Sequence, residues 1–512
     1  MNGMQIGMII YIVFFTIVGA SMFFFVRGSG RRFVIAGKRL PFFLIGTMLF
    51  SQALDANSTL GSTAGVYTSG FWYGFVFPFG LALCLLVVGA FYAKTLNRMN
   101  LITLPDYYFR RFNNTVEIIV GLLMAFSFVI LVAGNMAGAA YIMQMVFGIN
   151  FVTSLTIMSI IVLIYTFLGG LYSCAATDMI QDYVALGAFV AAAIWMLLTF
   201  GWGYFAEAIP PDFINFSGLT SIENLALVNW AGIAALALGD VIALDFMERV
   251  FAARTPEIAQ RGCYYGAFFT CVAGLAASLL GLMALKLFPG VAEPRTVLQM
   301  MAMTTLPFFI GLFIMAGVVG AGVSTANGGA LAVASVFARN LWQRNIGRWL
   351  RMRKARKLGR PPEEVAWKVM DERLLWYARL MIIPVMAISA YVAYVKPQPG
   401  MMLVLAFDVV FAGCLVPLTL GMYWKKANAW GALAAVIVGS LLRLVLYFSV
   451  GNPAFGIFYI PVELAGLDTL IPPVVSLIVM VPVSLLTQKQ DPPKHEVNFE
   501  VPTDEQVALT IR

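Results

Sequence analysis

Apolar runs long enough to cross a membrane follow one another along almost the whole of this sequence. A helix needs about 20 mostly apolar residues to span a hydrocarbon layer about 30 Å thick, because each helical residue rises about 1.5 Å. We count thirteen such runs. They lie near residues 4–26, 41–68, 71–95, 116–146, 152–171, 177–204, 227–247, 263–288, 306–340, 375–395, 399–424, 428–450 and 467–486. The runs lack the strict polar and apolar alternation of a membrane barrel, so they predict an all-α, polytopic membrane protein.

Charged residues are scarce and unevenly placed. They make up 11% of the chain, whereas soluble domains carry about 25%. The net charge of +8 does not indicate nucleic-acid binding, because the basic residues gather in alternate loops. The loop at 344–360 holds eight of them and Arg249, Arg254 and Arg261 are assigned to another, whereas loop 205–226 is nearly free of them. The positive-inside rule therefore predicts an amino terminus outside and a carboxyl tail inside, which requires the odd number of spans that we count.

The chain is predicted to form one membrane domain with a short tail. Residues 1–487 contain every apolar run, and residues 488–512 are predicted to be a short, flexible, cytoplasmic tail. The five cysteines show no metal-ligand spacing, and the single histidine, His495, lies in the tail. A catalytic triad, a Gly-rich phosphate loop and an HExxH motif are all missing from the sequence. These features argue against an enzyme.

The second run is interrupted by polar residues at its middle. Residues 51–61 read SQALDANSTLG, which makes a poor lipid-facing helix. Transporters often unwind a helix at the midplane, where freed carbonyls coordinate a cation. Asp55 lies about halfway along and is the leading candidate to meet a cation or an amine, because an ionisable group in hydrocarbon needs a partner. The alternative is a buried carboxylate paired with a structural donor.

The ninth run contains a group of oxygen-bearing residues. Ser324 and Asn327 share one face of a helix, and Ala321 lies one turn before Ser324 and Thr325. A carbonyl and two hydroxyls can therefore converge, and sodium prefers such oxygen ligands. The alternative is that these hydroxyls only bond the backbone of their own helix.

Three further carboxylates lie at or near membrane depth. Asp178 opens the sixth run, where it serves either an ion pathway or as a helix cap. Asp240 lies in the middle of the seventh run and Asp408 in the eleventh, and a partner on another helix is the simpler account of Asp408. Arg443 lies deep in the twelfth run, with a stem long enough to snorkel outward.

Four stretches of the chain resemble the sodium:solute symporters, and the likeness runs through nearly all of it. They are 33–41 (FVIAGKRLP), 165–181 (YTFLGGLYSCAATDMIQ), 248–262 (ERVFAARTPEIAQRG) and 321–343 (AGVSTANGGALAVASVFARNLWQ). Segments 169–173 (GGLYS), 337–340 (FARN) and 431–443 look most like the high-affinity choline transporter branch. The resemblance implies the fold of the leucine transporters, with spans two to six and seven to eleven forming two inverted five-helix repeats.

The resemblance also implies where sodium binds. The matching positions are the carbonyls of Ala53, Ala56 and Ala321 and the hydroxyls of Ser324 and Thr325. Some members hold a second sodium with the aspartate of the TDxxQ motif and two further hydroxyls. Here the motif supplies Asp178, but the two hydroxyl positions are occupied by Asn327 and by a glycine, so a second cation at Asp178 and Asn327 is incompletely liganded.

The substrate is less constrained by the resemblance. Choline transporters are built around an aromatic cage, but the positions that align here hold Ala53 and Ala243, which makes choline an improbable substrate. Asp55 and Asp240 instead suggest a solute that bears an amine, such as an amino acid or a polyamine. Their expected polar neighbours are Gln52, Asn57 and Asn135.

We therefore predict a sodium-coupled secondary symporter that imports a small organic solute across the cell (inner) membrane by alternating access. Its expected partners are the solute, Na⁺ and the lipid bilayer, without nucleic acid or an obligatory protein partner. The alternatives are a transporter-like solute sensor that signals to a partner, a proton-coupled symporter, and a channel or membrane enzyme.

Overall fold

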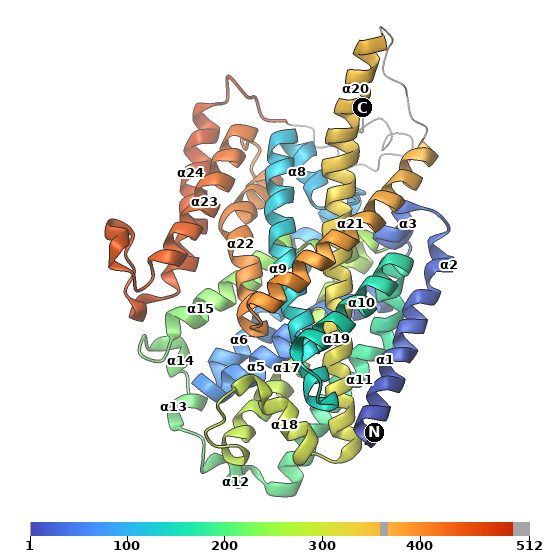
Figure 1. Ribbon diagram of the computed structural model, residues 1–512. Coiled ribbons are helices and arrows are strands. Elements are labelled where there is room, and N and C mark those ends of the chain that lie inside the picture. The colour runs from blue at the N-terminus through green and yellow to red at the C-terminus, as the bar shows by residue number, and fades with distance from the viewer. Residues whose placement is uncertain (1, 359–366, 495–512) are drawn as a thin grey trace.

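The computed structural model describes residues 2–358 and 367–494, and over these ranges its regular elements are helices (Figure 1). This confirms the all-α prediction. Within the described residues, eleven helices are long and apolar enough to cross a membrane, or twelve if one bent pair counts as a span. The predicted count of thirteen is not reproduced, because the second run divides into two helices that are each too short for this test.

The spanning helices follow the predicted runs closely. They are α1 with α2 (Gly3–Val26), α6 with η2 and α7 (Phe71–Arg98), α9 (Asn114–Phe147), α10 (Phe151–Gly169), α11 (Leu171–Phe200), α17 (Pro256–Leu287), α19 with η6 and α20 (Phe308–Leu358), α21 (Trp367–Val395), α22 (Pro399–Tyr423), α23 (Ala429–Ser449) and α24 (Leu467–Leu486). Local sequence sets several boundaries. The Asn113 side chain caps α9 by accepting from the Val116 N–H, and Gly148, with φ of 67°, ends that helix.

Two helices are broken near their centres. The first break separates α4 (Phe42–Ala53) from α5 (Ala56–Ser69), because Leu54 and Asp55 leave the helical conformation. The second separates α15 (Ala226–Ala234), continued by η3 (Ala235–Gly239) and η4 (Asp240–Ile242), from α16 (Leu244–Ala252). The two halves of this second helix are bent by 46°.

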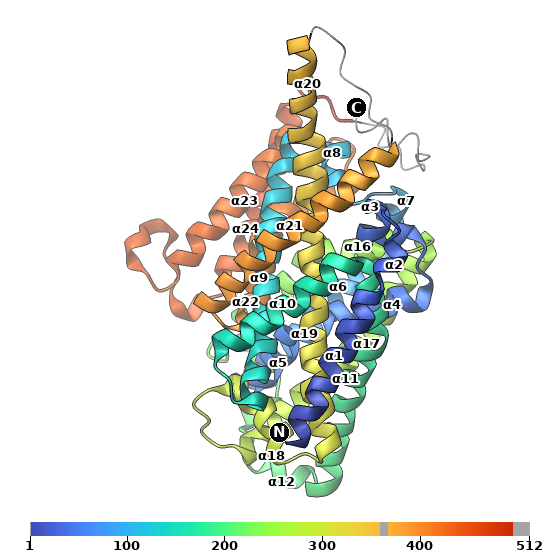
Figure 2. The same cartoon turned by 45° about the vertical axis from the view of Figure 1, so that its right-hand side comes forward.

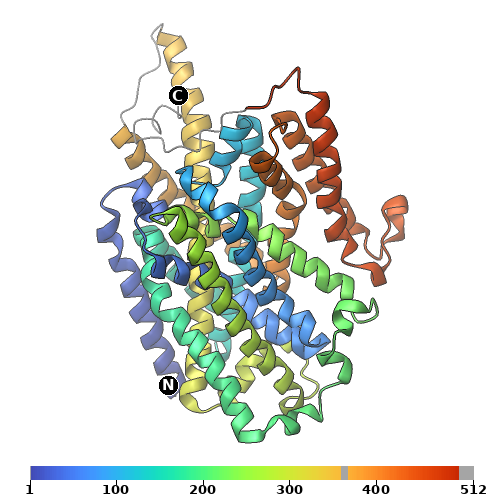
Figure 3. The same ribbon diagram turned by 180° about the vertical axis from the view of Figure 1, so that it is seen from behind.

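Small residues let the long helices pack closely around these breaks. α19 packs against α9 and α11, and a Cβ on Gly317 would lie 2.7 Å from the Ala185 Cβ. Such small residues at helix crossings are typical of membrane bundles. α1 runs along the outside of α10, α11 and α19 (Figure 2), and α17 lies over α4 and α6 (Figure 3).

One end of the bundle carries the basic helix α20. The basic helix α20 (Gly347–Leu358) and the end of α24 lie at the end opposite to the start of α1 (Figure 1). Opposite ends agree with an odd number of crossings, and the orientation in the membrane stays a prediction. Gln488 and Asp491 hydrogen-bond to Ser484 O and to the Ala429 N–H, which ties residues 488–491 to α23 and α24. His495 lies outside the described residues.

Candidate functional site

The first helix break is stabilised by Asp55, which caps α5. Its carboxylate accepts from the Ser58 N–H at 2.6 Å, the Asn135 side chain at 2.7 Å and the Asn57 side chain at 3.2 Å. Asp55 is fully buried, so these three donors replace the water that it lacks. The geometry fits the alternative of a carboxylate paired with structural donors.

Asn135 of α9 holds the break in place from the opposite side. While its amide nitrogen donates to Asp55, its Oδ1 accepts from the Ala56 N–H at 3.0 Å. One side chain thereby satisfies both the first N–H of α5 and the capping carboxylate. Asp55, Asn57 and Asn135, which were predicted as substrate ligands, thus form one hydrogen-bonded cluster that shapes the break.

The break lies directly against the middle of α19. The hydroxyls of Ser51 and Ser324 are 3.3 Å apart, and a Cβ on Gly322 would lie 2.8 Å from the Ala56 Cβ. The Ala53 carbonyl accepts from the Ser58 hydroxyl at 3.2 Å.

Thr325, one residue beyond Ser324, is fully buried, and its hydroxyl has no hydrogen-bond partner among the described residues. The structure therefore brings the helix break that carries Ala53 and Ala56 against the segment of α19 that carries Ala321, Ser324 and Thr325. An unpaired hydroxyl is left in that segment.

Asp178 of α11 and Asn327 of α19 lie where these two helices pack together. The Ser324 hydroxyl donates to Asp178 Oδ1, and the Asn327 amide donates to the Cys174 sulfur at 3.0 Å. The helix-cap interpretation of Asp178 is wrong, because Asp178 lies well inside α11 (Leu171–Phe200), which begins six residues before the start predicted for the sixth run. Its second oxygen and the Asn327 Oδ1 are buried without a partner in the described chain.

Sequence reasoning missed an arginine at the centre of the bundle. Arg249 was assigned to a loop, yet it is fully buried in α16 and donates to the Asp245 carbonyl at 2.9 Å. In the amide orientation that satisfies both neighbours, Gln52 donates to Asp245 Oδ2 at 2.8 Å and accepts from Arg249 at 2.9 Å. Gln52 thus belongs with Asp245 and Arg249 rather than with Asp55.

The Arg249 guanidinium also fills a position on α19. A Cβ on Gly328 would lie 2.6 Å from Arg249 Nη2. Gly328 therefore makes room for the Arg249 guanidinium. The family-like segment 248–262 was the only sequence signal for this residue, because a positive-inside count does not distinguish a buried arginine from a loop arginine.

Asp240 lies at the second helix break and is left without partners. It is 1% exposed, and neither carboxylate oxygen accepts a hydrogen bond within residues 2–358 and 367–494. Among the predicted substrate residues, Asp240 is the one whose hydrogen-bonding capacity is unused.

A cavity of about 710 Å³ opens between α5, α6, α15 and α22, on the α5 side of the breaks. Its lining includes an ion-paired cluster in which Arg443 contacts Asp408 and, at 3.1 Å, Asp468. The expected partner of Asp408 on another helix is therefore present. Arg443 does not snorkel outward, because pairing with two carboxylates keeps it 4% exposed.

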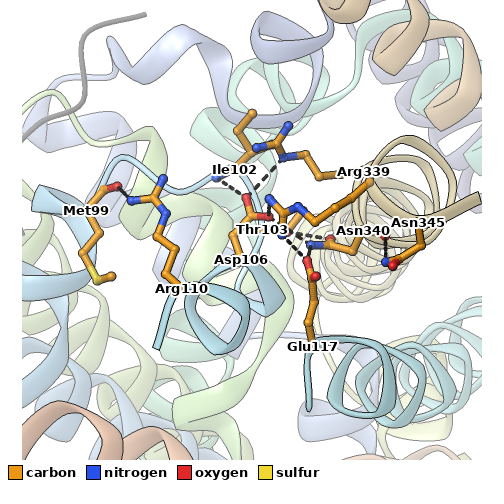
Figure 4. A network of polar contacts seen from close by, with 10 residues as sticks. Met99, Ile102, Thr103, Asp106, Arg110, Glu117, Arg339, Asn340 and Asn345 are labelled. Carbon is orange, nitrogen blue, oxygen red and sulfur yellow. Dashed lines mark hydrogen bonds and ion pairs between the residues drawn. The ribbon is translucent and has the colours of Figure 1, made fainter. Parts of the chain in front are cut away.

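A separate polar network joins α8 (Pro105–Arg111), α9 and η6 (Phe337–Ile346) (Figure 4). Arg344 pairs with Asp106 at 2.7 Å and with Glu117, and Arg339 pairs with Asp106 at 3.2 Å. Burial alone would raise the pKa of Asp106, but the guanidinium groups of Arg339 and Arg344 lower it below its usual range. Each carboxylate of the network is paired with at least one guanidinium, so this network serves the packing of the three elements.

Comparison with known proteins agrees with this architecture. The model of the sodium:solute symporter family matches residues 33–439. Sodium/proline symporters of Staphylococcus aureus are similar: that of strain bovine RF122 / ET3-1 is 24% identical over 499 residues, and that of strain JH9 is 23% identical over 497 residues. Each alignment covers 94% of this chain and 92% of the relative.

Two solved structures share the fold. A Na⁺-coupled sialic acid symporter in a substrate-bound, outward-open state matches with a TM-score of 0.75 at 16% identity, covering 98% of this chain and 100% of that one. Mhp1, a nucleobase-cation-symport-1 family transporter, matches with a TM-score of 0.53 at 12% identity, covering 94% and 98%. At these identities the likeness establishes the fold alone.

Proposed function

The chain belongs to the sodium:solute symporter family and is a sodium-coupled secondary transporter, and from this premise we propose that its solute is a small organic molecule that carries an amine. The proposed class includes amino acids and polyamines. We further propose that transport takes place across the cell (inner) membrane, in keeping with the bacterial source of the similar symporters.

The unpaired carboxylate of Asp240 carries this proposal. An ionised carboxylate in a buried site is penalised by several kcal/mol unless a cation or donors compensate it. Asp55 has its three donors, and the Asp245 carboxylate accepts from the Phe246 N–H and from Gln52, whereas neither oxygen of Asp240 accepts a hydrogen bond from a described residue. A protonated amine would supply both the charge and the hydrogen bonds that Asp240 lacks.

The curated relatives are named as sodium/proline symporters, and proline is itself an amine-bearing solute. The described residues around the two breaks include four buried carboxyl groups, Asp55, Asp240, Asp245 and Glu248, beside the buried Arg249. We therefore expect a solute whose amine is not fully offset by its own carboxylate to be bound more tightly than a neutral zwitterion.

We place the coupling sodium between the first break and α19, at what we call the first sodium site. Its ligands are the carbonyls of Ala53, Ala56 and Ala321 and the hydroxyls of Ser324 and Thr325. The unpaired Thr325 hydroxyl and the direct contact of Ser51 with Ser324 support this position. Sodium bound here links α4 and α5 to α19, so it favours the conformer in which these helices are together. Coupling follows because a ligand shifts an equilibrium only through different affinities for its two states.

Uptake by purified protein in liposomes tests the substrate class. Radiolabelled amino acids, polyamines, quaternary amines, carboxylates and sugars are offered with an inward sodium gradient. We expect accumulation of an amine-bearing solute. Asp240→Asn should reduce uptake about 100-fold or more, as expected when a buried charge pair of about 3 kcal/mol is lost. Accumulation of a carboxylate or a sugar, with Asp240→Asn fully active, would refute the proposal.

A matched control uses the exposed carboxylate of Asp212, outside the site. Asp212→Asn removes the same charge and should leave uptake unchanged. Binding of ²²Na⁺ to the Asp240→Asn protein should persist, because Asp240 is not a ligand of the first sodium site.

A further inference from the structure

A second cavity, of about 840 Å³, lies between α2 (Phe23–Val26) and the first turns of α21, at the end of the bundle that carries α20 (Figure 1). α3 (Gly30–Ile35) and α10 pack against α21 beside it (Figure 2). The first span ends with α2 and another begins with α21, so the cavity lies where spans reach the membrane surface. What fills a cavity at this depth comes from the lipid headgroups or from the adjoining solution.

The lining of this cavity is strongly basic. Its ionisable side chains are four cations and one carboxylate, namely Arg27, Lys368, Arg373 and Arg379, with Glu372. Four positive charges and one negative give the lining a formal charge of +3. None of the four cations forms an ion pair with a described residue. Asp371, also on α21, accepts from the Arg31 N–H at 2.8 Å and does not belong to the lining.

Arg379 is the buried cation of this set. It is 5% exposed, and its Nε–H has no hydrogen-bond partner among the described residues. Its Nη2 donates to the Leu168 carbonyl at 3.1 Å, at the carboxyl end of α10, where the helix dipole offers about half a negative charge. Four aromatic rings surround its guanidinium carbon at 5.4–5.6 Å, those of Phe23, Phe33, Phe167 and Trp376.

These neighbours of Arg379 attract a cation but carry no net negative charge. A buried charge that lacks a counter-charge is destabilising, so Arg379 needs an anion that the described chain does not supply. A guanidinium suits phosphate in particular, because its planar set of N–H donors matches the phosphate oxygens.

Exposed apolar side chains continue from the cavity along α2 and α21. Phe24 and Trp376 line the cavity, and Leu380 follows Trp376 by one helical turn. All three side chains are more than half exposed, so they face the bilayer. A basic cavity that continues into an apolar, lipid-facing surface matches a molecule with an anionic head and acyl chains, whereas a soluble phosphate would leave the apolar surface unused.

We propose that this cavity binds the headgroup of an anionic phospholipid from the leaflet on the α20 side. The phosphate supplies the negative charge that Arg379 lacks, and the acyl chains lie along the exposed apolar side chains of α2 and α21. Arg27, Lys368 and Arg373 strengthen the attraction at the rim. Because the lining stays net positive despite Glu372, a lipid with a net negative charge binds more tightly than a zwitterionic one. The inference does not depend on which solute the protein transports.

Native mass spectrometry of the delipidated, full-length protein in a neutral detergent counts bound lipids and gives their affinities. Phosphatidylglycerol, phosphatidylethanolamine and phosphatidylcholine with identical acyl chains are titrated separately. The wild type should bind one phosphatidylglycerol at least about tenfold more tightly than either zwitterionic lipid, and Arg379→Gln should lose this preference. Arg254→Gln is the matched control: Arg254 is exposed and does not line the cavity, so this variant should bind lipids as the wild type does.

A rim variant keeps the test decisive if Arg379→Gln does not fold. Lys368 and Arg373 are both exposed, so replacing both with glutamine should leave the melting temperature in lipid-free detergent unchanged. The same double variant should weaken phosphatidylglycerol binding about tenfold or more, because each cation near the headgroup contributes to the attraction.

Two results would overturn the proposal. If the wild type binds the three lipids equally, or if its preference survives in the rim variant, the aromatic rings and α10 alone satisfy Arg379. If glycerol 3-phosphate, which has no acyl chains, protects the wild type from heating as well as phosphatidylglycerol does, the occupant is a soluble phosphate and not a lipid. Neither measurement depends on uptake, so failure of the proposed function would leave both interpretable.

Discussion

Arg344→Ala should be among the most destabilising single substitutions in this chain. Arg344 is 5% exposed and pairs with Asp106 and with Glu117, which is fully buried. Its removal leaves Glu117 with one remaining donor, the Asn340 amide, while Asp106 keeps Arg339 and Asn340. Breaking a buried pair by removing one partner costs about 3–5 kcal/mol. Because Asp106 remains paired, we expect a loss near 3 kcal/mol.

The assay is heating in detergent followed by fluorescence-detected size-exclusion chromatography, which measures resistance to irreversible unfolding. Arg348→Ala is the matched control, because Arg348 is exposed on α20 and exposed substitutions usually change stability by less than about 0.5 kcal/mol. Adding Glu117→Gln to Arg344→Ala should restore part of the loss by removing the unpaired charge. If the Arg344→Ala and Arg348→Ala proteins melt at the same temperature, the network does not stabilise the fold as argued.

Three further predictions concern stability and uptake. Arg443→Met should lower the melting temperature through the same loss of a buried partner, and adding Asp408→Asn should recover part of it; a double variant worse than the single one contradicts this pairing. Asp106→Asn should lower the melting temperature equally at pH 5 and pH 8. The pKa of Asp106 is lowered in the folded state, so its ion pairs contribute their full stability above the unfolded-state pKa of about 3.9. This stability is lost only as the pH falls through the folded-state pKa. A loss seen at pH 8 but absent at pH 5 would refute the pairing. Gly61→Val should push α5 away from α22, because even a Cβ on residue 61 would lie 2.8 Å from the backbone of α22. We expect the substitution to lower the free energy of unfolding by about 1–3 kcal/mol and to reduce uptake. Gly187→Val, which has open space, should be neutral in both measurements.

The spans and the first break could be predicted because both follow from local chemistry. Hydrocarbon thickness fixes the length of an apolar run, and the polar residues around Asp55 cannot face lipid. The count of thirteen spans is not confirmed, because the break divides residues 41–68 into α4 and α5, and neither helix is long enough to count as a span by itself.

The partners inside the bundle could not be predicted, because they depend on distant segments. The donors to Asp55 include Asn135, which is 80 residues away in the sequence. Gln52 was predicted to be a substrate ligand beside Asp55, but it hydrogen-bonds to Arg249. Arg249 was placed in a loop because counting charges along the sequence does not show how deeply a residue is buried. Arg379 was not singled out, since only the fold reveals that it is buried with an Nε–H that no described residue accepts.

The most direct test of the account measures whether sodium alone drives uptake through the first sodium site. The proteoliposomes have an inward sodium gradient and the same pH inside and outside. They should accumulate the amine-bearing solute above its external concentration, and a sodium ionophore should abolish this accumulation. Thr325→Ala should require at least about tenfold more sodium for half-maximal uptake, because it removes one ligand of the site. Accumulation that follows a proton gradient alone, or a Thr325→Ala protein with unchanged sodium dependence, would contradict the account.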